Sequence, residues 1–282
     1  MGLFDFLKKK GAAGPAIDAE AQRRAEEKAR DEERERRWIE AREREARAEA
    51  EFAATLEAIP SVEIAISEKA APKRSVGEAD ELPFSTVTIK TPRDKLGNFV
   101  VIDTETTGLY PSQAEIVEIS AIRFRGFKPV EKFTTLCKPK KGISEEARRI
   151  NHISEEMVAD KPEFGKVADA LVAFIGKDNL VGHNLDFDLR FIVKHGADVA
   201  SVKRKYYDTL YLAQKTLKQE KKKWDKELHC YMPDYEADYD VEDYKLATLC
   251  EHYKIPFYGS HRALADCYVT GLLLEKLAQD RE

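Results

Sequence analysis

Hydrophobic and polar positions divide the chain into a charged N-terminal part and a C-terminal part with strand and helix patterns. From Asp18 to Glu57 the residues are mainly Glu, Arg and Ala, and no apolar seam repeats along them. Opposite charges recur four positions apart with the acid first, as in Glu33 and Arg37, and this order stabilises a helix. The pattern predicts a solvated single helix rather than a coiled coil, and Pro60 ends it.

Residues 61–97 have a mixed pattern that predicts a linker. Val62, Ile64 and Ile66 alternate with polar or small residues, and residues 86–90 alternate in the same way, which permits a short strand at each place. Residues 71–77 lie between them and contain the Pro and Gly typical of a linker. We therefore expect a helical arm over 1–60, a linker over 61–97 and a compact domain over 98–282.

The compact domain begins with strand patterns and continues with helices. Strands are expected at 99–102, 116–124, 130–136 and 179–182. Helices are expected at 144–150, 154–159, 164–175, 185–194, 208–217, 244–253 and 262–278. Consecutive strands followed by alternation with helices predict an α/β domain with a mixed sheet.

Composition limits the classes of function. The chain has 282 residues, 35% of them charged, and a net charge of −5, so any nucleic-acid contact must come from a local patch or from bridging metal ions. The four cysteines are scattered and form no CxxC pair, which indicates reduced thiols and a cytoplasmic protein. No apolar run is long enough to span a bilayer, so no transmembrane segment is expected.

Two carboxylates stand two residues apart at the end of the first expected strand. Side chains alternate along a strand, so Asp103 and Glu105 point the same way. Such close carboxylates resist ionisation unless a cation lies between them, and oxygen ligands suit Mg²⁺ or Mn²⁺. Taken alone, the pair is equally typical of an acidic strand end that faces water.

Further candidate groups occur in two later blocks. Asp186 and Asp188 both lie on the helix after Gly182-His183-Asn184, and the residues alone do not choose between them. Asp266 lies five residues after His261, a spacing that does not place both on one helical face. His261 must therefore reach the site from the start of the last helix, with Ser260 as a plausible N-cap. A neutral imidazole there could take a proton from an attacking water.

Together these blocks resemble the His-containing branch of the DEDD exonuclease superfamily, which includes the DnaQ-like proofreading exonucleases. The resemblance covers residues 98–280 and is carried by Val101–Leu109, by Gly182-His183-Asn184 with Asp188, and by His261-Arg262-Ala263 with Asp266. The other branch has Tyr at the place of Arg262. The resemblance implies an RNase H-like mixed sheet flanked by helices.

The resemblance also implies roles for individual residues. Asp103 would bridge two divalent cations, Glu105 and Asp266 would complete the shell of one, Asp188 would support the other, and His261 would be the general base. Residues expected to contact the substrate are Thr106, Gly108, Leu109, Asn151, Asn184 and Phe187. Asn151-His152 departs from the His-Gly of many relatives.

The expected function is a metal-dependent 3′→5′ exonuclease that releases nucleoside 5′-monophosphates from single-stranded DNA, in proofreading or repair. Three alternatives stay open: trimming of RNA, a non-catalytic binding module, and a scaffold in which the arm has the main role. The arm itself fits docking to a polymerase or other partner as well as a solubilising tail. The insertion Lys218–Met232 could track a phosphate backbone with Trp224 as a stacking platform, or form a solvated loop.

Overall fold

The computed structural model describes residues 15–72, 91, 96–225, 227–234, 237–259 and 261–280, without the side chains of residues 15–22. The chain divides into two compact units, residues 1–51 and 52–282. The strand expected at 86–90 and the cap expected at Ser260 lie outside the described residues.

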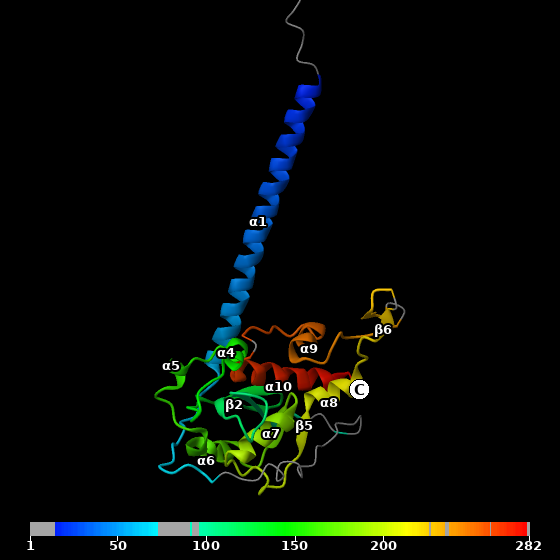
Figure 1. The fold of residues 1–282 in the computed structure, drawn as a ribbon. Coiled ribbons are helices and arrows are strands. Elements are labelled where there is room, and N and C mark those ends of the chain that lie inside the picture. Colours follow the sequence, from blue (N-terminus) through cyan, green and yellow to red (C-terminus); the bar gives the residue numbers. More distant parts are fainter. Residues whose placement is uncertain are drawn as a thin grey trace, which may run out of the picture. The chain divides into compact units, whose positions relative to one another are not determined.

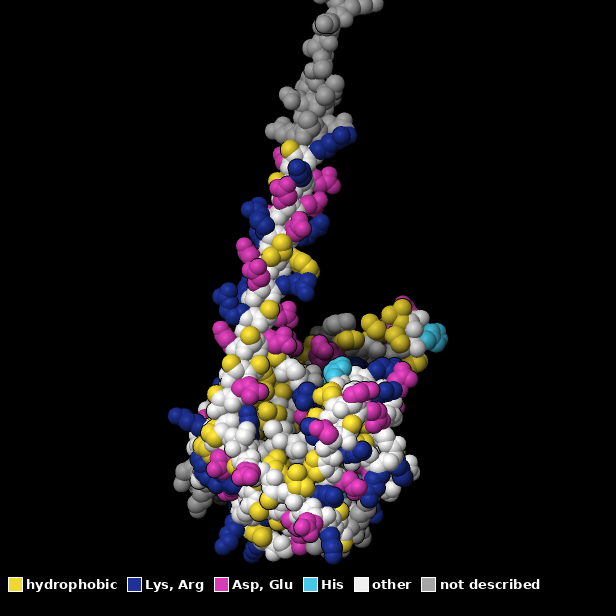
Figure 2. Space-filling model, turned by 90° about the vertical axis from the view of Figure 1, so that its left-hand side faces the viewer, with side chains coloured by type: hydrophobic (Ala, Val, Ile, Leu, Met, Phe, Trp, Pro, Cys, Tyr) yellow, Lys and Arg dark blue, Asp and Glu magenta, His cyan; other side chains and the backbone are white. Residues whose placement is uncertain are grey.

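The first unit contains most of the long helix α1 (Pro15–Ala58). Every side chain from Arg23 to Arg47 is exposed, and charges of both signs are interspersed along the helix (Figure 2). Glu33 pairs with Arg37 one turn away, and the Arg42 guanidinium lies 4.8 Å from the centre of the Trp38 ring. The prediction of a long, solvated, charged helix is confirmed.

The second unit is built on a five-stranded mixed sheet (Figure 1). Its strands are β1 (Asn98–Thr106), β2 (Ile116–Arg125), β3 (Lys128–Leu136), β4 (Asn179–Gly182) and β5 (Tyr206–Asp208), in the spatial order β3-β2-β1-β4-β5. The pairs β1–β2 and β2–β3 are antiparallel, whereas β1–β4 and β4–β5 are parallel. The mixed sheet was predicted, but the three-residue strand β5 was missed because so short a segment shows no periodicity.

Helices cover both faces of this sheet. They are α4 (Glu145–Asn151), α5 (Glu155–Val158), α6 (Phe164–Ile175), α7 (Leu185–Lys194), α8 (Thr209–Thr216), α9 (Leu246–His252) and α10 (Ala263–Gln279). Helix α10 packs on β1 and β2 from one side, and α6 and α7 pack on β2 and β1 from the other (Figure 1). All seven expected helices of this domain are present within a few residues of their predicted bounds.

Strand β1 is central and buried on both faces, and its alternation decides where the later side chains point. Phe99 and Val101 belong to the hydrophobic cluster on the α10 side, whereas Val100 and Ile102 belong to the cluster with α6 and α7. Since successive side chains of a strand point to opposite faces, Asp103 must point toward the α10 side and Thr104 toward the α7 side.

The end of α1 and the residues after it pack on the domain. Phe52 is 8% exposed and makes edge contacts with Tyr258 and Tyr268, each with ring centres 5.7 Å apart. The Lys132 ammonium group donates to the carbonyl oxygens of Leu56 and Glu57, at 2.7 and 3.3 Å, and so caps the end of the helix.

Residues 59–72, here called the strap, follow the edge of the sheet. Ser61 forms a single parallel bridge with Lys132 of β3, and Val62 and Ile64 then pack against the cluster around α6. The strand permitted by the alternation at 62–66 is absent, because after this bridge the strap leaves β3 and Ser67 bonds to the carbonyl of Lys166 instead. The strap shields an edge that would otherwise offer unpaired backbone groups.

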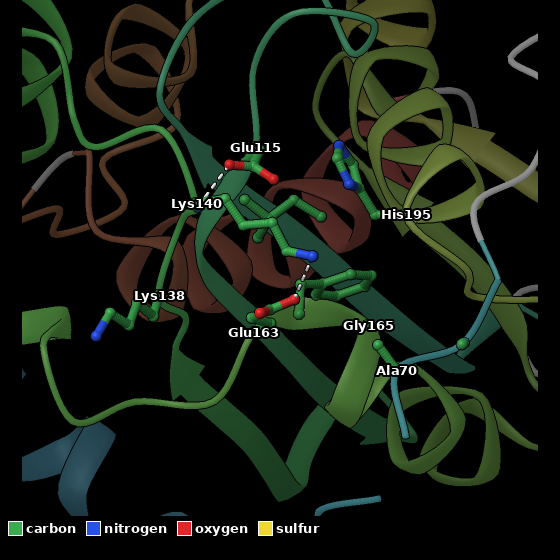
Figure 3. Close-up of a pocket in the computed structure, with 10 residues that line it drawn as sticks. Ala70, Glu115, Lys138, Lys140, Glu163, Gly165 and His195 are labelled. Carbon is green, nitrogen blue, oxygen red and sulfur yellow. Dashed lines mark hydrogen bonds and ion pairs between the residues drawn. The ribbon is translucent and has the colours of Figure 1, made fainter. Parts of the chain in front are cut away.

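A small cavity of about 110 Å³ lies where the strap meets α6 and α7 (Figure 3). Lys140 spans it, with its ammonium group 3.0 Å from a Glu163 carboxylate oxygen and its amide donating to Glu115. Lys138 donates to the carbonyl of Ala159. None of the residues predicted for the active site lines this cavity, and its lysines hold neighbouring segments together.

The insertion after α8 is largely exposed to solvent, as one expectation had it, but it forms a hairpin and not a loop. Its strands are β6 (Lys222–Asp225) and β7 (Cys230–Pro233), which pair in antiparallel fashion. The segment is polar and holds few β-branched residues, so its periodicity did not reveal the strands.

Substitution of Gly271 can test how α10 packs on the sheet. A methyl group at this position would overlap the ring of Phe124, which is fully buried on β2 and stacked on Phe99. We expect Gly271→Ala to destabilise the protein by about 1–3 kcal/mol despite the higher helix propensity of alanine. Lys276→Ala, on the exposed side of the same helix, is the control. Urea unfolding measures both, and equal stability of the two variants would contradict this packing.

Candidate active site

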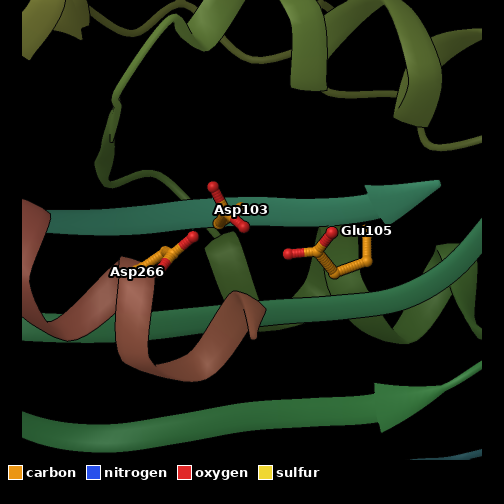
Figure 4. Close-up of side chains that lie close together, drawn as sticks. All are labelled: Asp103, Glu105 and Asp266. Carbon is orange, nitrogen blue, oxygen red and sulfur yellow. The ribbon is translucent and has the colours of Figure 1, made fainter. Parts of the chain in front are cut away.

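Three carboxylates converge at the exposed end of β1. Asp103 and Glu105 come from the strand and Asp266 from the first turn of α10, and one oxygen of each lies within 4.8 Å of the others. Their carboxylates point toward one another (Figure 4). The period of two along β1 explains the arrangement, since both strand residues face the helix that carries Asp266.

Asp188 approaches the same point from α7, on the other side of the strand. Its side chain is 3% exposed, and one oxygen accepts hydrogen bonds from the Thr104 amide at 2.9 Å and from the Thr104 hydroxyl at 2.6 Å. Asp186 instead pairs with Arg190 on the surface of α7, at 2.6 Å. The structure therefore places Asp188, and not Asp186, beside the other carboxylates.

His261 lies just before α10 in the left-handed backbone region, at a φ of 62°. Its side chain is exposed, and it lines the same cleft as the four carboxylates. The cleft has a volume of about 720 Å³. The five residues that sequence reasoning chose, from three distant blocks, are thus gathered in one place.

Burial disfavours the charged forms of all four carboxyl groups, and repulsion by other members of the cluster adds to it at Asp103 and Glu105. Loss of hydration, and then the charges of Asp188 and Asp266, raise the pKa of Asp103 well above its usual value. Loss of hydration, followed by the charge of Asp266, raises the pKa of Glu105 to about 8. Loss of hydration raises the pKa of Asp188 to about 7, although the Thr104 hydrogen bonds oppose the shift. The pKa of Asp266 rises to about 7 for the same first reason.

The donor set fits a divalent cation. One buried oxygen of Asp266 has no hydrogen-bond partner in the part of the chain that the structure describes, although buried oxygens normally have one. A hard cation would satisfy this oxygen and offset the repulsion among the carboxylates, and oxygen ligands of this kind are those that Mg²⁺ and Mn²⁺ prefer. The cluster is therefore suited to hold metal.

Sequence reasoning missed a fifth acid, Glu118. It lies directly opposite Glu105 in the β1–β2 ladder, and like charges in such pairs are destabilising. Glu118 accepts two hydrogen bonds from the Arg262 guanidinium, at 3.1 and 2.9 Å, and one from the Ala263 amide at 3.2 Å. The Arg262 guanidinium offsets the negative charge of Glu118. The bidentate pair also fixes the start of α10, between His261 and Asp266. Arg262 in the last motif was the available signal for such an acid, because an arginine next to the active-site carboxylates is expected to pair with a carboxylate.

Two further residues hold the second block in place. His183 is hydrogen bonded through Nδ1 to the Thr209 hydroxyl and through Nε2 to the Tyr244 carbonyl, both at 3.0 Å. Loss of hydration lowers the pKa of His183 to about 4, so its ring stays neutral at physiological pH. Asp208 accepts from the amides of Asn184 and Leu185, at 3.0 and 3.1 Å, and thereby fixes the start of α7.

The residues expected to contact substrate divide into two groups. Leu109, Asn184 and Phe187 line the cleft, and Leu109 is 73% exposed. Thr106 is the last residue of β1 and Gly108 lies in the turn after it. The Thr106 hydroxyl donates to the Gly108 carbonyl at 2.7 Å, and neither residue lines the cleft.

Asn151 does not lie where a substrate contact needs it. Its side chain is 1% exposed, donates to the Thr106 carbonyl at 3.5 Å and accepts from the Ile153 amide at 3.0 Å. These bonds turn the side chain inward, so Asn151 supports the end of β1 instead of facing the cleft.

Comparisons with known proteins identify the class of this protein. Residues 100–274 match the family described as Exonuclease (RNase_T). The chain is 29% identical over 192 residues to the DNA polymerase III subunit epsilon of Aquifex aeolicus, which covers 67% of this chain and 85% of that protein. It is 31% identical over 183 residues to the PolC-type DNA polymerase III of Oceanobacillus iheyensis, covering 64% of this chain and 11% of that protein. The chain thus spans only about a tenth of the PolC-type relatives that it matches.

A solved structure supports the fold. Escherichia coli exonuclease I in complex with a dA16 oligonucleotide aligns with a TM-score of 0.50 and 19% identity, covering 66% of this chain and 41% of that one. The chain belongs to the exonuclease family, and the resemblance to DEDD exonucleases is confirmed. Among the described helices, none is both long and apolar enough to cross a membrane.

The carboxylate cluster predicts how pH affects stability. In the folded protein Glu105, Asp188 and Asp266 have pKa values of about 7 to 8, above their ordinary values of 4.5 and 3.8. Between roughly pH 4 and 8 the folded state then binds more protons than the unfolded state. In EDTA the melting temperature should therefore fall as the pH rises through this range, and Mn²⁺ should stabilise the protein more at pH 8 than at pH 5.

Asp266→Asn is the control for this experiment. Removal of one charge should raise the melting temperature in EDTA at pH 8 by a few degrees and greatly reduce the stabilisation by Mn²⁺. An unchanged response of this variant to both pH and Mn²⁺ would show that the cluster is not the source of either effect.

The Glu118–Arg262 pair predicts an asymmetry between two substitutions. The Arg262 side chain is 43% exposed and can return to water, whereas the Glu118 side chain is 4% exposed. We expect Arg262→Gln, which leaves Glu118 without its cation, to cost about 3–5 kcal/mol, and Glu118→Gln to cost clearly less. Chemical denaturation measures both, and the reverse order would contradict this account of the pair.

Proposed function

We propose that this protein is a divalent-metal-dependent 3′→5′ exonuclease that removes nucleoside 5′-monophosphates from single-stranded DNA. The observation that carries the proposal is the meeting of Asp103, Glu105, Asp188, Asp266 and His261 in one cleft. Membership of the exonuclease family supports it independently.

The four carboxylates would hold two divalent cations, Mg²⁺ or Mn²⁺. Such ions, when bound, position the scissile phosphate and stabilise the charge that develops on the leaving 3′ oxygen. Asp103 lies close to Glu105 and Asp266, and it also feels the charge of Asp188. It would therefore be shared by both ions, with Glu105 and Asp266 completing the shell of one and Asp188 supporting the other. The buried Thr104 hydrogen bonds hold the Asp188 carboxylate in one orientation before substrate arrives.

His261 would be the general base. Its exposed ring stands at the mouth of the cleft, where it can take the proton from the attacking water. The Glu118–Arg262 pair anchors Arg262, the residue directly after His261, so the backbone that carries the His261 imidazole is fixed.

The walls of the cleft suit unpaired bases. Leu109, Phe187, Leu246 and Phe257 supply apolar surface, and Asn184 and Gln214 supply amide groups. Bases of a single strand can rest on such surfaces, whereas paired bases are covered by their own stack. We infer that the terminal base lies against Leu109, the most exposed of these apolar residues.

The arm formed by α1 would serve recruitment. One relative is named as a subunit of DNA polymerase III, and a solvated helix is a suitable spacer to a larger partner. Removal of residues 1–51 should then leave turnover unchanged and abolish partner binding.

Substitutions at the site test the proposed chemistry. Asp103→Ala and Asp266→Ala should abolish release of mononucleotides in Mg²⁺ while the protein stays folded, because the remaining carboxylates cannot hold both ions. His261→Ala should reduce the rate by about 10²–10⁴-fold. The measurement is the ladder of products from a 5′-labelled single strand of DNA, with RNA of the same sequence as a competing substrate.

Asp186→Ala is the matched control, since this surface carboxylate lies only two residues from Asp188 and pairs with Arg190. It should retain the full rate. Full activity of the wild-type protein in excess EDTA, or of Asp103→Ala in Mg²⁺, would refute the metal-dependent mechanism.

A further inference from the structure

We infer that the β6–β7 hairpin carries a binding face for the single strand upstream of the cleft. This inference rests on the proposed exonuclease function, because it concerns the substrate of the same site. The hairpin projects from the domain beyond α8 and α9 (Figure 1).

The pairing of the two strands separates their side chains into two unlike faces. Trp224 lies opposite Tyr231, and Lys222 lies opposite Pro233. Directly opposed residues of an antiparallel pair share a face, and so do residues two apart. One face therefore holds Lys222, Trp224, Tyr231 and Pro233, with a cation and two aromatic rings and no carboxylate.

The other face holds Lys223, Asp225, Cys230 and Met232. Here the Lys223 ammonium group lies 2.8 Å from Asp234, whose side chain is 13% exposed. The charge of Lys223 is thus offset within the protein. Lys222 and Lys223 are neighbours in the sequence with different surroundings, and they form a natural pair of test and control positions.

The two rings on the first face are open to solvent. Trp224 is 51% exposed and Tyr231 is 66% exposed, with ring centres 5.1 Å apart and planes inclined by 72°. Exposed apolar surface of this kind, formed by neighbouring aromatic rings, often marks a binding site. Nucleic-acid bases stack on such rings, with about 1–3 kcal/mol per base, and a nearby cation attracts the phosphates.

The base of the hairpin is joined to the wall of the cleft. The Tyr244 hydroxyl donates to the Leu217 carbonyl at 2.9 Å, and Gln219 bridges to Val241. Tyr244 itself lines the cleft, as does Gln214 from the last turns of α8. A strand that leaves the cleft between α8 and α9 would therefore pass the foot of the hairpin that carries the aromatic face.

Two acids of the segment that follows the hairpin are engaged at its foot. Asp240 accepts from the Lys218 amide at 2.7 Å. Asp243 accepts from the Thr248 hydroxyl at 2.6 Å and lies 2.9 Å from the Lys245 ammonium group. These groups fasten the segment to α8 and α9, and the aromatic face presents Lys222 as its charge.

The test compares long and short substrates, because only a long strand can reach from the cleft to the hairpin. KM and kcat are measured in Mg²⁺ on single-stranded DNA of about 20 nucleotides and of about 4 nucleotides. The Trp224→Ala/Tyr231→Ala double variant should raise KM for the long strand about tenfold or more, with kcat and the short strand unchanged. Lys222→Gln should raise KM for the long strand less and should weaken its dependence on salt.

Two matched controls keep the interpretation specific. Lys223→Gln removes a cation from the opposite face, and Tyr239→Ala removes a 45% exposed aromatic ring from the segment that follows the hairpin. Both should behave as wild type. An unchanged KM for the long strand in the double variant would overturn the inference, as would an equal rise in the controls or an equal rise for the short strand.

Failure of the proposed function would look different. A wild-type protein that hydrolyses neither strand would refute the exonuclease assignment before any hairpin variant is examined. Fluorescence anisotropy of the labelled long strand in EDTA would still test the hairpin in that case, since a binding face needs no turnover. Equal affinity of wild type and double variant in that measurement would overturn the inference.

Discussion

The site is governed by one constraint: four carboxylates are brought together and lose their hydration at the end of a buried strand. Loss of hydration is the largest cause of the raised pKa at Asp103, Glu105, Asp188 and Asp266, and the charges of neighbouring members of the cluster add to it at Asp103 and Glu105. Without a cation the folded state bears this unfavourable free energy, and with a divalent cation the same carboxylates would become ligands. One buried oxygen of Asp266 has no hydrogen-bond partner among the described residues, which is the same requirement at a single atom. Function and instability thus have one physical origin, as is common where strain collects at active sites.

The topology of the sheet supplies the geometry. Strand β1 is central, and its alternation sends Asp103 toward α10 and Thr104 toward α7. Asp266 and Asp188 then approach the end of β1 from opposite sides. Asp266 lies directly against Asp103 and Glu105, whereas hydrogen bonds from Thr104 hold Asp188. Glu118 on β2 ties the start of α10 to the sheet through Arg262, so that the helix cannot shift without breaking a partly buried ion pair. Two well-packed faces therefore hold a site that is unfavourable in itself.

Much of this arrangement followed from local patterns. Periodicity predicted the central strands and the helices, and the two-residue spacing of Asp103 and Glu105 predicted a shared direction. Choosing Asp188 over Asp186 needed family spacing, because both lie in the first turn of one helix. Contacts between distant segments could not be predicted from local sequence patterns. Examples are the inward orientation of Asn151, the pairing of Glu118 with Arg262, and the packing of Phe52 on Tyr258 and Tyr268. The β6–β7 hairpin escaped notice because polar strands lack a hydrophobic alternation.

Direct titration with Mn²⁺, followed by electron paramagnetic resonance of the free ion, tests the central claim most directly. If the four carboxylates form one centre, the wild-type protein binds two Mn²⁺ ions. Asp103→Asn removes the carboxylate that both ions would share, so this variant should lose both. Retention of both ions by Asp103→Asn, or failure of the wild-type protein to bind any Mn²⁺ at neutral pH, would contradict the account.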